Sequence, residues 1–290
     1  MKYKITAIFV AYNPDLEALK KSARILKDQG CEICLVNNSV EEIEPFFPYM
    51  KVINFGKNKG IAQAQSTGME WAFQENKSDF ILQMDQDSIP APDLVENLLS
   101  AWETLTLMGQ KIGLIGSLDI DKDTFISSQA KINKGKEIGE TGLIAVSEIL
   151  SSGSLIPKST FQHLGGPDPK LFIDLVDFEY CWRINYSGLK VIKNPSAKIY
   201  HKLGEGKVKV FGLLPVGLPK PFRHYYSVRN TVYIVLNGEA PIFWKVSNIF
   251  KLLFKLIIYP FALPQGKERF KFIVKGLKDG VMKRFEIINA

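Results

Sequence analysis

The sequence predicts an α/β protein built on a mostly parallel sheet with helices on both faces. Apolar runs typical of strands alternate with helical patterns before residue 200, and polar residues recur where the strands end. The chain has 290 residues, of which 46% are hydrophobic, so it can bury a substantial core. Because crossovers between alternating strands and helices are right-handed, neighbouring strands are expected to be parallel.

The elements follow one another in a regular order. We predict strands at 5–10, 31–36, 51–54 and 80–84, where apolar residues cluster. We predict helices at 15–27, 61–73 and 93–107, and the first of them has apolar residues at helical spacing. Asn13, Pro14 and Asp15 supply the turn and the start signal of that helix.

The composition disfavours several classes of protein. The first residues lead directly into a strand without a signal peptide, so we expect a cytoplasmic protein. Three cysteines are too few and too irregular for a disulfide framework, and we expect Cys31, Cys34 and Cys181 to pack in the core. The chain has neither a dinucleotide-binding G-x-G-x-x-G motif nor a P-loop, and no nucleic-acid-binding motif.

The positive charge is concentrated at one end of the chain. Residues 241–290 hold ten Lys or Arg against three acids, a net charge of +7 that equals the net charge of the whole chain. Within 242–259, Lys245, Asn248, Lys251 and Lys255 fall on one side of a helical period, and apolar residues cover most of the rest. We expect a helix in the headgroup plane of an anionic membrane, with packing on its own domain as the alternative.

Polar residues follow each of the four predicted strands. The carboxyl ends of parallel strands are where open α/β sheets bind ligands, so these residues should share one cleft. In chain order they are Tyr12-Asn13, Asn37-Asn38-Ser39, Asn58-Lys59-Gly60 and Asp85-Gln86-Asp87.

Asp85 and Asp87 directly follow the strand at 80–84. Two hard oxygen donors at a sheet edge suit a divalent cation, Mg²⁺ or Mn²⁺, that holds a pyrophosphate, whereas a helix cap or a solvated turn is the alternative. Without a P-loop, the phosphates would be held by this cation, by Lys59 and by the helix that starts near Ile61.

Five motifs in order resemble the family 2 inverting glycosyltransferases of the GT-A fold, particularly bacterial rhamnosyltransferases. They are the segments 9–13, 36–39, 58–64, 85–87 and 174–179. The resemblance covers about residues 3–230 and implies a GT-A domain at 1–240, with a nucleotide-sugar half at 1–117 and an acceptor half at 118–240. Residues 241–290 would form a membrane-associating tail.

The resemblance also implies roles for single residues. The nucleotide sugar would be bound by Ala11, Tyr12, Asn13, Asn38, Asn58, Gly60, Gln63 and Asp85. Asp87 and His201 would bind the metal, although a histidine beside Lys202 is equally consistent with a surface position. Asn37 replaces an acidic residue with which the family often reads a pyrimidine, so the choice of base stays open.

An inverting transfer needs a carboxylate that removes the proton of the acceptor hydroxyl. Asp177 corresponds to the family's base, with Asp174 in the same loop as the alternative. Asp177 should lie at the start of a helix over 178–186, where the dipole opposes a raised pKa, and an N-cap role is the other interpretation. Gly153 resembles part of the family's acceptor-side loop and would admit a sugar closely, and a plain turn is equally consistent. Arg229-Asn230 resembles a late diphosphate or acceptor contact, with ordinary helix surface as the alternative.

We therefore expect a metal-dependent glycosyltransferase that is peripheral on the inner face of the cell membrane. It would move L-rhamnose from dTDP-rhamnose onto a lipid-linked glycan in surface polysaccharide assembly. Transfer of another hexose from UDP is the alternative activity, and a catalytically inactive glycan-recognition protein is the alternative from another class.

Overall fold

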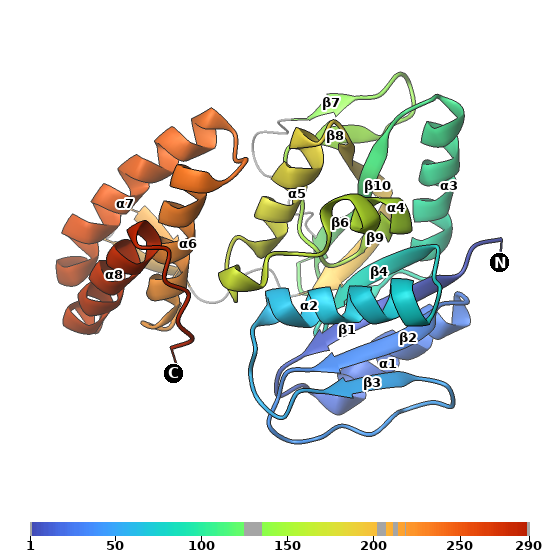
Figure 1. Cartoon of the computed structure of the whole chain (residues 1–290), viewed down its shortest axis with the longest axis horizontal. Coiled ribbons are helices and arrows are strands. Elements are labelled where there is room, and N and C mark those ends of the chain that lie inside the picture. The colour runs from blue at the N-terminus through green and yellow to red at the C-terminus, as the bar shows by residue number, and fades with distance from the viewer. Residues whose placement is uncertain (1, 125–134, 202–206, 211–213, 218, 289–290) are drawn as a thin grey trace.

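A computed structural model describes residues 2–124, 135–201, 207–210, 214–217 and 219–288 (Figure 1). An open sheet carries helices on both faces, and three further helices stand beside it. These three are α6 (Arg223–Asn237), α7 (Ile242–Ala262) and α8 (Gly266–Val281). The predicted α/β class with a helical C-terminal extension is confirmed.

The described part of the main sheet has the strand order β3-β2-β1-β4-β9-β6-β10-β8-β7, with β5 paired to β10. In that order the strands are Lys51–Asn54, Glu32–Asn37, Ile5–Ala11, Phe80–Asp85, Ser154–Pro157, Ile112–Asp121, Lys190–His201, Ile144–Val146 and Lys136–Glu137, and β5 is Ile89–Pro90. The strands β11 (Lys207–Val210) and β12 (Leu214–Gly217) form a separate antiparallel pair.

The sheet is mixed in direction. The first four strands, β1 to β4, pair in parallel, as do β6 and β10. The strand β9 runs antiparallel to both β4 and β6, and β8 runs antiparallel to β10. The parallel half therefore matches the alternating strand and helix pattern of residues 5–85. The second half departs from it because β8 and β9 follow loops or turns rather than crossover helices.

Strand β1 contributes side chains to the two hydrophobic cores that lie on opposite faces of the sheet. Ile5, Ala7 and Phe9 face one core, and Ile8 and Val10 face the other, which is the period of two expected of a strand. The first core is closed by α1 (Leu16–Asp28) and α3 (Leu94–Leu107). The second is closed by α2 (Ile61–Glu70), the π-helical turn Trp71–Glu75, α4 (Lys158–Leu164) and α5 (Val176–Tyr186).

Local signals set the element ends as the sequence predicts. Asp15 caps α1, because its Oδ1 accepts hydrogen bonds from the N–H groups of Glu17 (3.1 Å) and Ala18 (3.2 Å). A short 3₁₀ helix, Pro169–Leu171, is capped in the same way by Asp168 and precedes the loop that leads into α5. Helix α8 lies in the predicted helical tail at 241–290, although its bounds were not predicted, and no bounds were predicted for α6 either.

The three cysteines are buried and free, as expected of core residues. Burial raises the pKa of each thiol to about 12, so all three stay protonated and unreactive near neutral pH.

The C-terminal helices differ in what they bury. Helix α6 packs against α7 and α8 and buries nine of its fifteen residues. Helix α7 buries Tyr259, whereas most of its apolar side chains are exposed. Within the described ranges, no helix is long and apolar enough to cross a bilayer.

Candidate active site

A cavity of about 290 Å³ lies at the carboxyl ends of β1, β2 and β4. Its lining includes six of the residues predicted to bind the nucleotide sugar or the metal: Tyr12, Asn38, Asn58, Gly60, Asp85 and Asp87. Strand ends that are far apart in the sequence thus meet at one edge of the sheet, which is the position predicted from the parallel topology.

Three other residues predicted to bind the nucleotide sugar lie outside this cavity. Ala11 is fully buried in the core of β1. The backbone N–H of Asn13 donates to Ser39 Oγ (2.8 Å), and Gln63 Nε2 donates to Thr67 Oγ1 (3.1 Å) within α2. Their roles toward a nucleotide stay predictions, since the hydrogen bonds that the structure gives them are local.

The asparagines hold the cavity wall together. Asn38 Nδ2 donates to Asn58 Oδ1 (2.9 Å), and Asn38 Oδ1 accepts from the Lys59 N–H (2.7 Å). These bonds tie the loop after β2 to the loop after β3. Asn37 is fully buried and donates to the Glu41 carbonyl (2.6 Å) and to Asn54 Oδ1 (2.7 Å). Asn37 is thus engaged inside the fold rather than facing the cavity.

Gly60 begins α2 at the cavity wall and has a positive φ of 87°. A Cβ atom at this position would lie 2.5 Å from the ring of Phe172, which lines the same cavity. The position therefore needs glycine for its backbone conformation and for the close approach of a neighbouring loop.

Gln86, between the two aspartates, is a lining residue that the sequence did not single out. Its Oε1 accepts from the Tyr12 N–H (2.6 Å), and its Nε2 donates to the Tyr12 carbonyl (3.2 Å). This reciprocal pair joins the ends of β1 and β4 and leaves the Tyr12 side chain half-exposed at the cavity. No sequence signal identifies this contact, because Tyr12 and Gln86 become neighbours only through strand pairing.

Four carboxylates influence one another at this edge. Burial, and then the charges of Asp177, Asp87 and Asp119, raise the pKa of Asp85 to about 7. Asp85 thus connects the Asp87 cavity electrostatically to Asp177, which is 92 residues later in the chain. Such a group of like charges favours binding of a cation.

Asp177 lines a second cavity of about 360 Å³ that shares Ile61 and Ile173 with the first. It is the second residue of α5, and its carboxylate accepts hydrogen bonds from the Ser151 N–H and hydroxyl. The helix N-cap is Leu175, so the interpretation of Asp177 as the N-cap is wrong. Burial raises the pKa of Asp177 and outweighs the helix dipole that was expected to oppose such a shift.

Asp174, the alternative base, lies in the same cavity but is paired. Its Oδ1 accepts from Arg223 Nη2 at the start of α6. A carboxylate that is held by a guanidinium has one oxygen occupied, whereas Asp177 is held by neutral donors. The arrangement favours Asp177 as the proton acceptor.

His201 lies at the end of β10, with its Nδ1 3.7 Å from Asp119 Oδ1. Asp119 is a buried residue of β6 that the sequence analysis missed, and its charge reaches both Asp85 and Asp177. The histidine thus borders the carboxylate group through Asp119 rather than lining the Asp87 cavity.

The donor chemistry of this edge suits a hard divalent cation, since the carboxylates supply oxygen ligands. Among the described residues, however, no three His, Cys, Asp or Glu side chains come together closely enough to hold a metal by themselves. These two facts fit a cation bound by one or two carboxylates and completed by substrate phosphates and water, as Mg²⁺ often is.

The loop between the two cavities has unusual backbone geometry. Phe172, Asp174 and Leu175 all have positive φ, at 62°, 67° and 64°. Such angles are costly for residues other than glycine and persist only where other contacts impose them. Phe172 and Ile173 line the first cavity, and Asp174 and Leu175 line the second.

Arg229 and Asn230 of α6 supply those contacts. Asn230 Nδ2 donates to the carbonyls of Leu171 (2.9 Å), Ile173 (2.8 Å) and Asp174 (2.8 Å). Arg229 Nη2 donates to the carbonyls of Lys170 and Leu171. Both side chains are fully buried, so their expected role as direct diphosphate or acceptor contacts is wrong; they fix the loop instead.

Gly153 also has a different role from the one expected. It has a φ of 73°, and a Cβ atom there would lie 2.0 Å from Ser117 Oγ. The space that glycine leaves is therefore filled by the protein's own serine rather than left open for a sugar.

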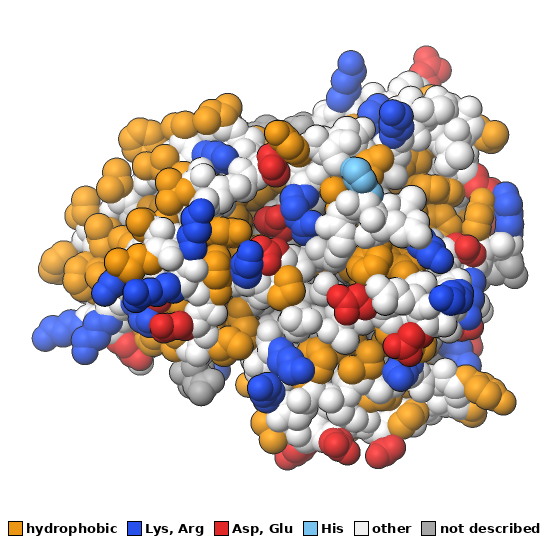
Figure 2. All heavy atoms as spheres, viewed as in Figure 1, with side chains coloured by type: hydrophobic (Ala, Val, Ile, Leu, Met, Phe, Trp, Pro, Cys, Tyr) orange, Lys and Arg blue, Asp and Glu red, His pale blue; other side chains and the backbone are white. Residues whose placement is uncertain are grey.

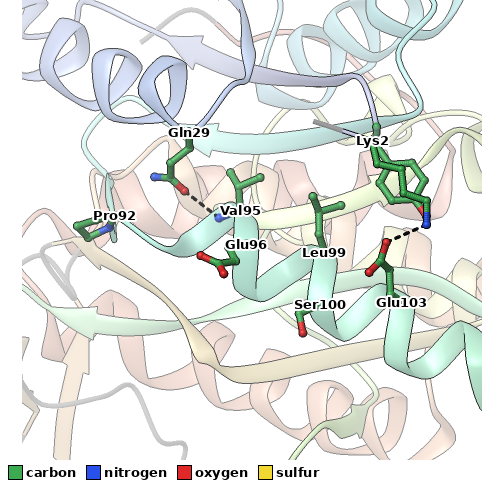
Figure 3. Close-up of a pocket in the computed structure, with 9 residues that line it drawn as sticks. Lys2, Gln29, Pro92, Val95, Glu96, Leu99, Ser100 and Glu103 are labelled. Carbon is green, nitrogen blue, oxygen red and sulfur yellow. Dashed lines mark hydrogen bonds and ion pairs between the residues drawn. The ribbon is translucent and has the colours of Figure 1, made fainter.

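A larger cavity of about 480 Å³ lies elsewhere, between α3 and the first residues of the chain (Figure 3). Two pairs of its lining residues bind each other: Lys2 Nζ contacts Glu103 (3.1 Å), and Gln29 Oε1 accepts from the Val95 N–H (2.9 Å). None of the predicted site residues lines it. The candidate active site is therefore the pair of smaller cavities.

Comparisons with known proteins show what this chain resembles. The model of the family "Glycosyl transferase family 2" matches residues 6–113, which include β1 and the Asp85–Asp87 segment. A relative described as the dTDP-rhamnosyl transferase RfbF of Shigella flexneri is 27% identical over 288 residues, or 95% of this chain and 93% of the relative.

Solved structures of low sequence identity share the fold. GalNAc-T7 with UDP, GalNAc and Mn²⁺ matches 98% of this chain with a TM-score of 0.60 and 14% identity. This chain spans 58% of the GalNAc-T7 chain. S. aureus TarS 1–349 with UDP-GlcNAc matches 97% of this chain and 82% of its own, with a TM-score of 0.59 and 12% identity. Residues 6–113 thus match the glycosyltransferase family 2 model, and the chain shares the GT-A fold of these structures, which its motifs predicted.

Proposed function

We propose that this glycosyltransferase transfers L-rhamnose from dTDP-rhamnose with inversion, using Asp177 as the base. The observation that carries this proposal is the position of Asp177 in a cavity adjoining the one lined by Tyr12, Asp85 and Asp87. A donor in the first cavity and an acceptor in the second would meet beside this carboxylate.

The chemistry follows from the position of the base. The acceptor hydroxyl attacks the anomeric carbon from the face opposite the diphosphate, while Asp177 accepts the hydroxyl proton. The raised pKa makes Asp177 a stronger base than an ordinary aspartate. Hydrogen bonds from Ser151 would hold the carboxylate in place during this step.

We propose that Asp87, with Asp85 beside it, binds Mg²⁺ or Mn²⁺, and that His201 is a further ligand. A bound divalent cation offsets the negative charge that builds on the departing diphosphate. The mutual effect of the four carboxylates on Asp85 supports cation binding at this edge. The N-terminus of α2 and Lys59 would add positive charge on the opposite wall.

The donor assignment draws on the relative, which is described as a dTDP-rhamnosyl transferase. Tyr12 offers a half-exposed ring on which a nucleobase could stack, and Asn38 and Asn58 lie beside it. A UDP-hexose is the alternative donor, because TarS and GalNAc-T7 are described with UDP or UDP-GlcNAc.

For the acceptor we propose a lipid-linked glycan of a surface polysaccharide, used at the inner face of the cell membrane. The basic, apolar tail supports this assignment, because it would bring the enzyme to the surface where such an acceptor resides.

Thermal unfolding with nucleotides tests the donor. We expect dTDP with Mg²⁺ or Mn²⁺ to raise the melting temperature more than UDP or GDP does, since a ligand that binds only the folded state stabilises it. Asp87→Asn should remove the part of the shift that depends on the cation, whereas Asp93→Asn, at an exposed helix start outside the cavity, should keep it. No stabilisation by any nucleotide would contradict the assignment, and stabilisation without hydrolysis of dTDP-rhamnose would favour an inactive glycan-binding protein.

A further inference from the structure

Helix α7 presents its apolar side to solvent. Nine large apolar side chains on it are exposed, and they recur every three or four residues so that they form one face. We call this set the α7 face: Ile242, Phe243, Val246, Ile249, Phe250, Leu253, Phe254, Ile257 and Phe261. Figure 2 shows hydrophobic side chains gathered along the left rim, where Figure 1 places α7.

The lysines of α7 are arranged differently from the sequence expectation. Lys245 Nζ donates to the Gly238 carbonyl (2.8 Å), and Lys255 Nζ donates to Ser227 Oγ (3.2 Å) of α6. Burial lowers the pKa of Lys255. Two of the three lysines thus attach α7 to the protein, and Lys251 is the one that is exposed. The polar side of the helix faces inward because α6 offers oxygen acceptors there.

Helix α8 places basic residues beside this face. Lys267, Lys271 and Lys278 are exposed on α8, interleaved with exposed Phe270 and Val274. The segment that follows adds exposed Lys283 and Arg284. Figure 2 shows Lys and Arg side chains below the hydrophobic rim, on the side of α8. An apolar face bordered by lysines is complementary to a membrane of anionic lipid.

We propose that the α7 face inserts between the headgroups of an anionic lipid surface, with the exposed lysines of α8 contacting the phosphates. An apolar area of this extent on a monomer marks an interaction surface. A second copy of the chain is the less favourable partner, because pairing two such faces would bring two sets of lysines together. The helix would lie along the surface, consistent with the absence of a membrane-spanning helix from the described ranges.

The docking surface is connected to the second cavity through α6. Ser227, which binds Lys255 of α7, lies one helical turn after Arg223, which lines the cavity of Asp177. Docking would therefore hold that cavity near the lipid surface. This consequence rests on the proposed function, since it assumes that the acceptor is lipid-linked.

Sedimentation with vesicles tests the proposal. We expect the full chain to bind vesicles of phosphatidylcholine with about 30% phosphatidylglycerol and to bind pure phosphatidylcholine at least about tenfold more weakly. Phe250→Asp should reduce binding by about tenfold or more, because it places a charge in the apolar face. Leu107→Asp, at an even more exposed apolar residue on α3, is the control and should bind as the wild type does.

A second pair of variants tests how much the lysine charges contribute to vesicle binding. Changing Lys251, Lys267 and Lys271 to Glu should weaken binding to anionic vesicles by about tenfold or more and reduce its dependence on salt. The same change at Lys20 and Lys21, which are exposed on α1, should have little effect. Circular dichroism and the melting temperature of each variant would exclude misfolding as the cause of any loss.

Two results would overturn the proposal. One is wild-type protein that stays in solution with anionic vesicles, or Phe250→Asp protein that still binds them fully. The other is a wild-type dimer that Phe250→Asp converts to a monomer without lipid, which would make a second copy the partner. Nucleotide stabilisation of the same samples separates this proposal from the enzymatic one, because neither measurement depends on the other.

Discussion

Helices α6 and α7 are neighbours in sequence and in space, but α6 is largely buried whereas most apolar side chains of α7 are exposed. Helix α6 buries Arg229, Asn230 and His224, each with hydrogen-bond partners. Helix α7 is the more hydrophobic sequence and leaves its phenylalanines in solvent. The difference shows that hydrophobicity alone does not assign a helix to the core: α6 serves the active-site loop, and α7 offers a surface. The predictions below test this division.

The largest effect is expected at Asp177, which lines the same cavity as Arg223 of α6. Asp177→Asn should lower kcat by on the order of 10²–10⁴-fold, because asparagine keeps the shape but cannot accept the proton. Asp174→Asn should cost much less if Asp177 is the base. In the wild type, the raised pKa of Asp177 predicts that kcat/KM falls as pH drops, beginning above the ordinary range for aspartate. A larger loss in Asp174→Asn would exchange the two roles.

Asn230→Ala should destabilise the fold by on the order of 3 kcal/mol, since it removes the side-chain donor of the Ile173 and Asp174 carbonyls, whereas the Leu171 carbonyl keeps its bond from Arg229. It should also weaken donor binding, because Phe172 and Ile173 line that cavity. Asn248→Ala on α7 is the matched control: its Nδ2 contacts one carbonyl in its own helix, and a change within about 0.5 kcal/mol is expected. Equal losses in the two variants, measured by urea unfolding, would contradict the division between the helices.

Protonation of His224 should make the stability of the folded protein depend on pH. Burial, and then the charges of Arg269 and Lys255, lower its pKa from 6.5 to about 4. The unfolded chain binds this proton at higher pH than the folded chain does, so stability should be full above about pH 6.5 and fall as pH drops toward 4. The free energy of unfolding lost across this pH range is on the order of 3 kcal/mol.

The variant His224→Gln keeps an acceptor for Arg269, which donates from Nη1 to the ring nitrogen (2.7 Å), without titrating. Its unfolding free energy should vary less with pH than that of the wild type between pH 4 and 6.5. His163→Gln, at an exposed position on α4, should leave the wild-type profile unchanged. Identical profiles for all three proteins would rule out this histidine as the source.

The smallest effect on stability is expected on the α7 face. Phe250→Ala should change the free energy of unfolding by less than about 0.5 kcal/mol, because the ring is 67% exposed. Ile234→Ala, at a fully buried residue of α6, should cost about 2–5 kcal/mol. A large loss in Phe250→Ala would indicate that α7 packs on the protein through the face described here as exposed.

The sequence by itself determined the parallel half of the sheet, the carboxylates Asp85 and Asp87 at its edge and the resemblance to family 2 glycosyltransferases. Strands such as 5–10 and the cap Asp15 are encoded by neighbouring residues, so local spacing reveals them. Motifs of polar residues after strands predicted the cavity, because parallel topology brings those ends together.

Only the tertiary structure decided what depends on partners distant in the chain. Asp119 joins the carboxylates through strand pairing, Arg229 and Asn230 turn inward to fix a loop nearly 60 residues earlier, and Ser117 fills the space at Gly153. Lys245 and Lys255 of α7 point inward because acceptors on α6 and at its end lie there. A residue's spacing predicts which face of a helix it occupies, but packing decides whether that face meets protein or solvent.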